Sequence, residues 1–178
     1  MKEMEKLFEK GIEFIKKIKN EKVFLIHHTD VDGLASAALA FIALKRIGVK
    51  VSKVVARSVD ERKKISDDLK KCEKAVILDV PLENFEELKK TGKEILIIDH
   101  HPSTVINTKK IVCINPRIVK KDIYQPTSYL VYKFFAKLVN LKDKEWLSVL
   151  GTLADFGFED CKDLLKKWIK IKRKSSIL

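Results

Sequence analysis

The sequence predicts an α/β fold, with a doubly wound sheet of about five parallel strands flanked by helices. Three observations support this prediction. Short apolar runs alternate with longer segments of helical periodicity, as in strand–helix–strand crossover units. Two of the runs, residues 23–26 and 95–98, are apolar throughout, which is typical of parallel strands buried on both faces. The length of 178 residues suits a single domain.

The first half of the chain predicts a helix, a strand, a second helix, a second strand and a third helix. Apolar residues recur near a 3.6-residue period in the opening segment. Gly48 ends the second helix, and Asp60 is expected to cap the third. The predicted elements are a helix at 2–19, a strand at 22–28, a helix at 33–47, a strand at 50–57 and a helix at 60–71.

The second half of the chain predicts three further strands and four helices. Pro81 ends one strand, and Asn115 with Pro116 ends another. Pro126 opens a helix at its first turn, where proline is tolerated. The predicted elements are strands at 75–79, 94–99 and 111–114, and helices at 83–90, 126–139, 143–154 and 160–172.

The net charge of +12, from 37 Lys and Arg against 25 Asp and Glu, allows two interpretations. One is a polyanionic partner such as nucleic acid. The other is a composition of the thermophile type, in which charged residues are enriched for stability. Basic residues gather near the end, where residues 162–174 hold seven Lys or Arg and one Asp. Charge alone therefore does not define the function.

Composition favours a cytoplasmic protein without a membrane partner. No run of 18 apolar residues is present, so no membrane-spanning helix is expected. The first 20 residues mix charged and apolar types, unlike a secretory signal peptide. Cys72, Cys113 and Cys161 lack CxxC spacing, which argues against a disulfide framework or a zinc finger. We expect them to be small buried apolar side chains.

All four histidines occur in two adjacent pairs, and each pair lies beside aspartate. One pair is in residues 27–33 (HHTDVDG) and the other in residues 99–102 (DHHP). Each pair follows directly on an apolar run, so each stands at the carboxyl end of a predicted strand. Ligands bind at that edge of an open parallel sheet. Imidazole and carboxylate groups together are the ligand set of a divalent metal site.

Two more aspartates belong to the same set. Asp79 ends the third predicted strand, and Asp155 ends an apolar helix, where the helix dipole disfavours an anion that lacks a compensating cation. Together with Asp30 and Asp32 they bring four negative charges into one region and should raise one another's pKa. Two divalent ions would balance these charges, with Mn²⁺ favoured and Mg²⁺ or Zn²⁺ as alternatives. Such a pair of ions activates water for phosphoester hydrolysis.

These residues resemble a known family. The motifs His28-x-Asp30-x-Asp32-Gly33, Asp79, Asp99-His100-His101 and Asp155 are similar, in order and separation, to the four N-terminal motifs of the DHH phosphoesterases. The HxDxDG form and Asn115-Pro116 look like the RecJ-type nucleases, particularly archaeal ones.

The resemblance implies a DHH domain at residues 1–160, followed by a basic helix or tail at 161–178. Complete DHH enzymes carry a second domain that binds substrate and has a glycine-rich motif, and nothing in this sequence resembles it. The tail is therefore expected to be a linker toward that absent domain, which a partner could also supply.

The resemblance assigns the metal ligands to two sites that share one aspartate. Asp79 would bridge the two ions, as the residue common to both sites. The first ion would be held by His28, Asp30 and Asp79, and the second by Asp32, Asp79, His100 and Asp155.

The resemblance also implies two catalytic residues. Asp99 would orient His100 by a hydrogen bond. His101 would face the scissile phosphate, as an electrostatic stabiliser or proton donor. Gly33 could also meet a phosphate at the start of its helix, with a tight strand-to-helix turn as an equal alternative. His27 is expected to pack against a helix, because neighbouring strand residues point to opposite faces.

Four other polar or aromatic residues are interpreted as structural. For Thr127 and Ser128 we favour helix capping over substrate contact. For Trp146 and Trp168 we favour the core over base stacking, because both lie in helical patterns.

The expected function is a single-strand-specific 5′ exonuclease of RecJ type, which hydrolyses DNA or RNA with a metal-activated water. The first alternative is a phosphodiesterase or phosphatase for oligonucleotides, cyclic dinucleotides or nucleoside bisphosphates. The manganese pyrophosphatases are disfavoured, because that branch resembles HxxxDxD and residue 26 is Ile. The last alternative is a non-catalytic replisome scaffold, since archaeal RecJ-like proteins associate with the GINS complex. Complete ligand positions argue against it. The expected partners are single-stranded DNA or RNA, and a GINS-type complex.

Overall fold

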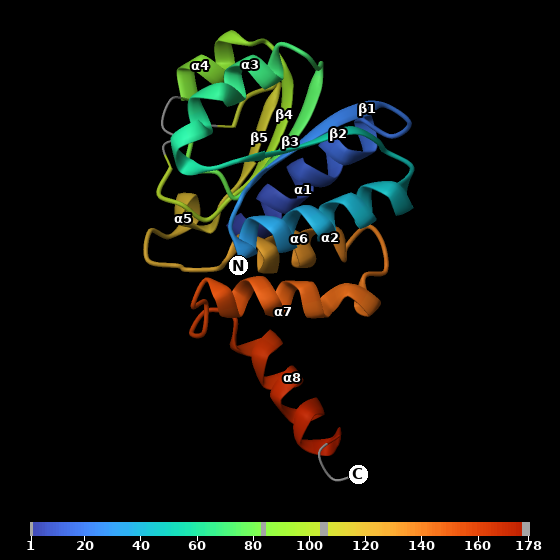
Figure 1. Ribbon diagram of the computed structural model, residues 1–178, viewed down its shortest axis with the longest axis vertical. Coiled ribbons are helices and arrows are strands. Elements are labelled where there is room, and N and C mark those ends of the chain that lie inside the picture. Colours follow the sequence, from blue (N-terminus) through green and yellow to red (C-terminus); the bar gives the residue numbers. More distant parts are fainter. Residues whose placement is uncertain (1, 83–84, 104–106, 176–178) are drawn as a thin grey trace.

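One sheet of five strands forms the centre of the computed structural model, which describes residues 2–82, 85–103 and 107–175 (Figure 1). All neighbouring strands are parallel, in the order β2-β1-β3-β4-β5. Helices cover both faces, so the predicted doubly wound α/β fold is confirmed. The strands are β1 (Lys22–His28), β2 (Lys50–Arg57), β3 (Lys74–Leu78), β4 (Glu94–Ile98) and β5 (Ile111–Ile114).

The helices follow the predicted alternation with the strands. Those before β4 are α1 (Lys2–Lys17), α2 (Val31–Ile47), the 3₁₀ helix η1 (Val59–Lys64), α3 (Ile65–Leu69) and α4 (Phe85–Lys90). Those after β5 are α5 (Pro116–Val119), α6 (Thr127–Phe135), the 3₁₀ helix η2 (Lys142–Lys144), α7 (Glu145–Ala154) and α8 (Lys162–Ser175).

Strand alternation divides the apolar residues between two cores, one on each face of the sheet. Leu25 of β1 joins the larger core with residues of α1, α2, α6 and α7. Its neighbour Ile26 joins the smaller core with residues of α3 and α4. Both side chains are fully buried, as predicted for strands covered on both faces. Strand β2 lies at the edge and exposes most of its residues, which agrees with its alternating pattern.

Some predicted boundaries are wrong. The segment expected as one helix at 60–71 is a 3₁₀ turn followed by a short α-helix. Asp60 is not its cap, because Ser58 holds the cap position and its side chain makes no capping hydrogen bond. The helix predicted at 126–139 ends at Phe135, and α5 was not expected. Glu83, the predicted start of α4, lies outside the described residues.

The carboxyl ends of the strands hold the polar residues in register. The backbone N–H of Asp79 donates to the Ile98 carbonyl (3.1 Å), and that of Asp99 donates to the Ile114 carbonyl (3.1 Å). These bonds continue the ladder one residue past β3 and β4. The strand order changes direction between β1 and β3, the position at which such sheets bind ligands. The edge between them is therefore the place where a site is expected.

Helix α8 packs on the domain at its start and projects away from it at its end (Figure 1). Lys167 (2.6 Å) and the Trp168 indole (2.9 Å) both bond the Oε2 of Glu145, which is buried in α7. Leu164 is buried beside them in the larger core. The separation into a domain at 1–160 and a tail at 161–178 remains a prediction.

No helix among the described residues is long and apolar enough to cross a membrane. The three cysteines are free thiols; Cys113 and Cys161 are buried as predicted, whereas Cys72 is half-buried.

Candidate metal centre

The six predicted metal ligands meet at the carboxyl edge of the sheet. Among the described residues, three groups have ligand atoms that all lie within 4.8 Å of one another. Two of these groups contain Asp79, so the fold brings the predicted bridging residue to the centre. The groups are His28 with Asp30 and Asp79, Asp32 with His100 and Asp155, and Asp79 with His100 and His101.

The first group is built by the tight turn from β1 into α2. Asp30 is the N-cap of α2, and its Oδ1 accepts the N–H of Gly33 (2.8 Å). Its Oδ2 lies 2.7 Å from His28 Nδ1. The same His28 nitrogen is 4.0 Å from Oδ2 of Asp79, the residue that directly follows β3. A strand end and a helix cap thus present one imidazole and two carboxylates to a common point.

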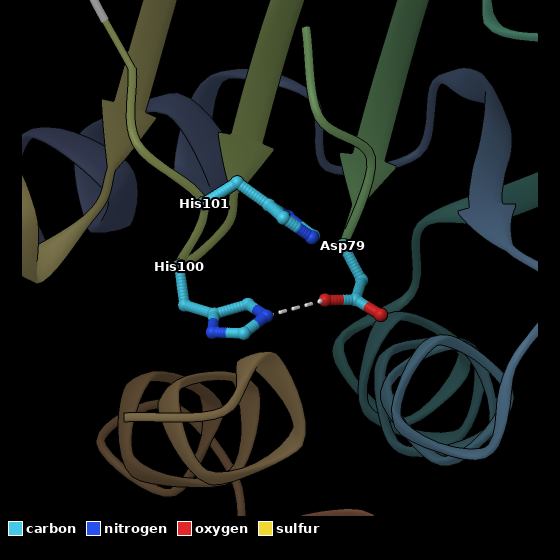
Figure 2. A group of neighbouring side chains, drawn as sticks. All are labelled: Asp79, His100 and His101. Atoms are coloured by element: carbon cyan, nitrogen blue, oxygen red, sulfur yellow. Dashed lines mark ion pairs between the residues drawn. The ribbon is translucent and has the colours of Figure 1, made fainter. Parts of the chain in front are cut away.

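The second group joins β4 to α2 and α7. His100 Nε2 lies 3.4 Å from Asp79 Oδ1 and 3.5 Å from Asp155 Oδ2. Figure 2 shows the rings of His100 and His101 turned toward the Asp79 carboxylate from the loop after β4. Asp155 is the C-cap of α7, as its predicted position at a helix end implied.

Asp32 of α2 links this helix to the start of α6 by hydrogen bonds. It is buried in the first turn of α2, and its carboxylate accepts the backbone N–H groups of Thr127 (2.6 Å) and Ser128 (3.1 Å) at the start of α6. A Cβ on Gly151 of α7 would overlap the Ser128 hydroxyl and the Asp32 carboxylate. Glycine is therefore required there, because α7 approaches α2 and α6 too closely for any side chain.

Burial makes the acids of this centre unequal. Burial, and then the charge of Asp30, raise the pKa of Asp79 to about 8. Burial, and then the charge of Asp79, raise the pKa of Asp32 to about 7. Partial burial alone would raise the pKa of Asp30, but hydrogen bonds from Gly33 and His28 outweigh it and lower that pKa. The predicted repulsion between carboxylates thus raises the pKa values of the buried acids, but it is a smaller cause than desolvation.

Asp99 pairs with His101, so the prediction that it orients His100 is wrong. Asp99 Oδ1 lies 2.7 Å from His101 Nδ1, and Oδ2 accepts the His101 backbone N–H (3.2 Å). Asn115 Nδ2 donates to the His101 carbonyl (2.9 Å). The reason is the turn that follows β4: the bond between the His101 backbone N–H and the Asp99 carboxylate brings the His101 ring to the same carboxylate. Burial lowers the His101 pKa, but bonding to Asp99 outweighs this and raises it.

The residues present fit divalent metal ions. Among the described residues, Asp79 Oδ2 and His100 Nδ1 are buried polar atoms without a hydrogen-bond partner. Burial, followed by the charge of His101, lowers the His100 pKa, which favours the neutral imidazole that a metal requires. Metal–ligand bonds near 2.1 Å place ligand atoms roughly 3 to 3.5 Å apart. The separations around His100 Nε2 fall in this range.

Three other residues singled out in the sequence, Gly33, His27 and Thr127, make contacts within the fold around the metal centre. The Gly33 N–H donates to Asp30, and a Cβ there would overlap the His28 carbonyl, which supports the tight-turn interpretation; a phosphate contact at Gly33 stays a prediction. His27 is buried as predicted, with Nδ1 2.6 Å from the His28 carbonyl oxygen. Thr127 is buried, and its hydroxyl donates to Asp79 Oδ1 (2.8 Å).

Helix capping and aromatic burial also differ in part from expectation. Asp32 caps α6 through the backbone of Thr127 and Ser128, so these residues are capped and their side chains do not cap. Trp168 packs against the core as predicted. Trp146 is 47% exposed, so its assignment to the core is wrong.

Tyr124 is a site residue that the sequence did not reveal. Its hydroxyl donates to Asp155 Oδ2 (2.6 Å), and its ring meets the His100 ring edge to face at 5.1 Å. Burial and the bond to Asp155 raise the pKa of this phenol. The Arg117 guanidinium lies 5.5 Å from the Tyr124 ring centre. Tyr124 comes from the loop between α5 and α6, and Arg117 from the four-residue helix α5, so no apolar periodicity marks either residue.

Solved structures with this fold are similar in shape but distant in sequence. RecJ from Thermus thermophilus in complex with Mn²⁺ aligns with a TM-score of 0.62 and 18% identity over 85% of this chain. A DHH domain described as part of a member of a ribosomal protein family aligns with 0.68 and 17% over 98%. CDC45 from Entamoeba histolytica aligns with 0.57 and 15% over 96%.

The chain spans 24%, 48% and 37% of the lengths of these three proteins, in the same order. A comparison with curated proteins found no match. The model of the DHH family N-terminal domain matches residues 22–155, a range that contains all six predicted ligands. The chain therefore belongs to the DHH family, of which it contains the N-terminal domain.

Proposed function

We propose that the protein is a metal-dependent phosphoesterase that hydrolyses single-stranded nucleic acid from the 5′ end with two divalent ions, Mn²⁺ being favoured. One observation carries the proposal: Asp79 faces both His28 and His100, so a single carboxylate joins two potential ligand groups. Membership of the DHH family and a likeness to Mn²⁺-bound RecJ support metal-dependent hydrolysis. Nucleic acid as substrate is consistent with the net charge of +12.

The residues of the chain have distinct roles in this proposal. His28, Asp30 and Asp79 would hold one ion, and the buried side, with Asp32, His100 and Asp155, would hold the other together with Asp79. When bound, the two ions supply a more acidic water and neutralise charge on the phosphate. Tyr124 keeps the Asp155 carboxylate in place through its 2.6 Å hydrogen bond.

In this proposal His101 contacts the phosphate. Asp99 and Asn115 hold its ring and its backbone, and the ring turns toward Asp79 (Figure 2). Its side chain is 29% exposed, against 6% for His100, so substrate can reach it. The bond from Nδ1 to Asp99 leaves Nε2 to donate to a phosphate oxygen or to the leaving group.

The test is a panel of substrates with Mn²⁺: 5′-labelled single-stranded DNA and RNA, short oligonucleotides, bis-p-nitrophenyl phosphate and pyrophosphate. We expect shortening of the single strands from the 5′ end and no hydrolysis of pyrophosphate. Asp79→Ala should remove all activity, because it would remove the ligand common to both ions. Activity retained in this variant would contradict the two-metal mechanism.

Metal binding separates the enzyme from a non-catalytic scaffold. Titration calorimetry of the full chain with MnCl₂ should show two bound ions. A protein that binds no Mn²⁺ or Mg²⁺ at millimolar concentration would contradict the phosphoesterase proposal and favour the scaffold.

A further inference from the structure

The turn that follows Asp155 carries two exposed phenylalanines. Phe156 is 75% exposed, the largest value among the exposed large apolar side chains of the described residues, and Phe158 is 45% exposed. Neither belongs to the two apolar cores of the domain. Their rings meet edge to face, with centres 6.1 Å apart and planes at 80°. Exposing two aromatic rings at one place has no role in packing this domain.

The backbone holds these rings in a defined position. Phe156 has a φ of 54°, a left-handed conformation that is rare for a bulky residue. The Gly157 N–H donates to the Thr152 carbonyl (2.9 Å), and the Phe158 N–H donates to the Phe156 carbonyl (2.8 Å). A Cβ on Gly157 would overlap the Pro126 ring, so the turn is packed tightly against the start of α6. Strain of this kind persists where the surroundings impose it, and it is frequent at ligand sites.

The turn is directly continuous with the metal centre. Asp155, the residue before Phe156, lies 3.5 Å from His100 Nε2 through its carboxylate. The same carboxylate accepts the Tyr124 hydroxyl, and the Arg117 guanidinium lies over the Tyr124 ring. Among the described residues, Arg117 Nε is a buried donor without a hydrogen-bond partner. Asp155 thus connects two features: Tyr124 and the Arg117 cation through its carboxylate, and the exposed phenylalanines through the turn that begins at the next residue.

We propose that Phe156 and Phe158 form an aromatic platform that stacks a nucleobase of the strand bound at the metal centre. Aromatic side chains beside a positive group are the usual means of holding single-stranded nucleic acid, because every base has a flat face that can stack. The inference rests on the proposed function and deepens it, since a platform for bases selects a nucleotide chain over pyrophosphate or a simple phosphate ester.

The test compares two ligands of equal charge, with and without bases. One is a dye-labelled single strand of thymidines, and the other is a strand of the same length made of abasic residues; phosphorothioate linkages in both slow hydrolysis. Anisotropy with MnCl₂ gives Kd for each ligand with the full chain. We expect the wild type to bind the thymidine strand more tightly. Phe156→Ala and Phe158→Ala should each weaken that binding about 5- to 150-fold, the usual effect of losing one stacked base.

The control is Leu150→Ala, which removes an exposed apolar side chain of α7 (47% exposed) that lies within the helix and precedes the turn. It should leave both Kd values unchanged, and Phe156→Trp should restore the preference for bases. Equal binding of the two strands by the wild type would overturn the platform. So would an equal loss for both strands in Phe156→Ala, which is the result expected if the ring only supports the fold, and so would unchanged binding of both strands, which is expected if the ring docks another protein.

The proposed function and the platform fail in different ways. Hydrolysis is measured separately, on the unmodified thymidine strand with Mn²⁺. A preference for bases that depends on Phe156, without any hydrolysis, would support the platform and contradict the phosphoesterase. Hydrolysis without such a preference would do the reverse.

Discussion

The metal centre has an open half, formed by His28 and Asp30, and a buried half, formed by Asp32, His100 and Asp155, with Asp79 common to both. The two halves stabilise negative charge differently. The Asp30 side chain in the open half is 47% exposed, whereas that of Asp79, which both halves share, is 1% exposed. Asp30 caps a helix and bonds His28, and its pKa is lowered. Asp79 and Asp32 are desolvated and close to other carboxylates, and their pKa values rise to about 8 and about 7.

The difference shows which half depends on a cation. Water and local hydrogen bonds stabilise the ionised form of Asp30 without any metal. For Asp79, the Thr127 hydroxyl is a single neutral donor, and Oδ2 has no hydrogen-bond partner among the described residues. An ionised carboxylate in that position needs positive charge beside it. The buried half should therefore dominate both metal binding and the response to pH.

The largest effect is expected on activity. Asp79→Asn keeps the shape of the side chain but removes its charge, and it should lower Mn²⁺-dependent phosphodiester hydrolysis at least ~10³-fold, since metal ions supply several kcal/mol of catalysis. Asp30→Asn should lower activity less, because it removes one exposed ligand of one ion. Steady-state kinetics with saturating Mn²⁺ measures both. Equal losses in the two variants would contradict the unequal roles of the halves.

The stability of the metal-free protein should fall as the pH rises from about 4 to about 8. A carboxyl group with a higher pKa in the folded than in the unfolded state binds more protons when folded, so its contribution is lost as it ionises. Asp79 and Asp32 together should account for on the order of several kcal/mol of unfolding free energy across this range. Urea unfolding in EDTA at pH 5 and pH 8 measures this difference.

Asp79→Asn serves as the control for the pH effect and should make the profile shallower, because only the buried Asp32 then ionises in this range. The lowered pKa of Asp30 acts only below about pH 4, outside this range. Mn²⁺ at 100 times its Kd should restore about 2.7 kcal/mol at pH 8. Metal-free protein that is more stable at pH 8 than at pH 5 would show that the buried acids are not desolvated as described.

Gly151→Ala tests how closely the buried half is packed. The added methyl group would overlap the Asp32 carboxylate and the Ser128 hydroxyl, and should destabilise the protein by about 1–3 kcal/mol. Denaturant unfolding of the metal-free protein measures this change. Leu150→Ala on the exposed side of the same helix should change stability by less than about 0.5 kcal/mol. Similar values for the two variants would mean that α7 can move away from α2 without loss.

The smallest expected effect comes from Tyr124→Phe. Loss of the hydrogen bond to Asp155 should weaken Mn²⁺ binding about tenfold, as is usual for residues that orient a metal ligand. Tyr132→Phe is the matched control, because it also loses a bond to a carboxylate (Glu145, 2.9 Å), but one that supports α8. Calorimetry with MnCl₂ compares them. Unchanged affinity in Tyr124→Phe would show that Asp155 needs no support.

Elements with a strong apolar pattern were predicted well, and those without one were not. Strands such as Glu94–Ile98 are apolar on both faces, because a parallel sheet buries both. The charged segment at 60–71 has few apolar residues to define its period, and it divides into a 3₁₀ turn and a short helix. Helix α5 has four residues, too few for any periodicity to be seen.

The candidate site was predicted from residue types, but its internal bonds were not. Asp79 and Asp155 were recognisable because acids follow apolar elements at the sheet edge. The pairing of Asp99 with His101 depends on how the chain turns after β4, and the contact of Tyr124 with Asp155 depends on a loop. No regular spacing in the sequence indicates such contacts, because they are made by residues of turns and loops.

The sequence by itself determined the succession of strands and helices along the chain and the ligand types at the strand ends. Buried segments leave a direct apolar pattern in the sequence, and the polar residues that follow them mark the carboxyl ends of the strands. Only the tertiary structure decided which acids are desolvated, which histidine Asp99 holds, and that two phenylalanines remain exposed beside Asp155. The physical reason is that solvation and hydrogen bonding at the site depend on the surfaces that α2, α6 and α7 enclose together. No one segment contains that information.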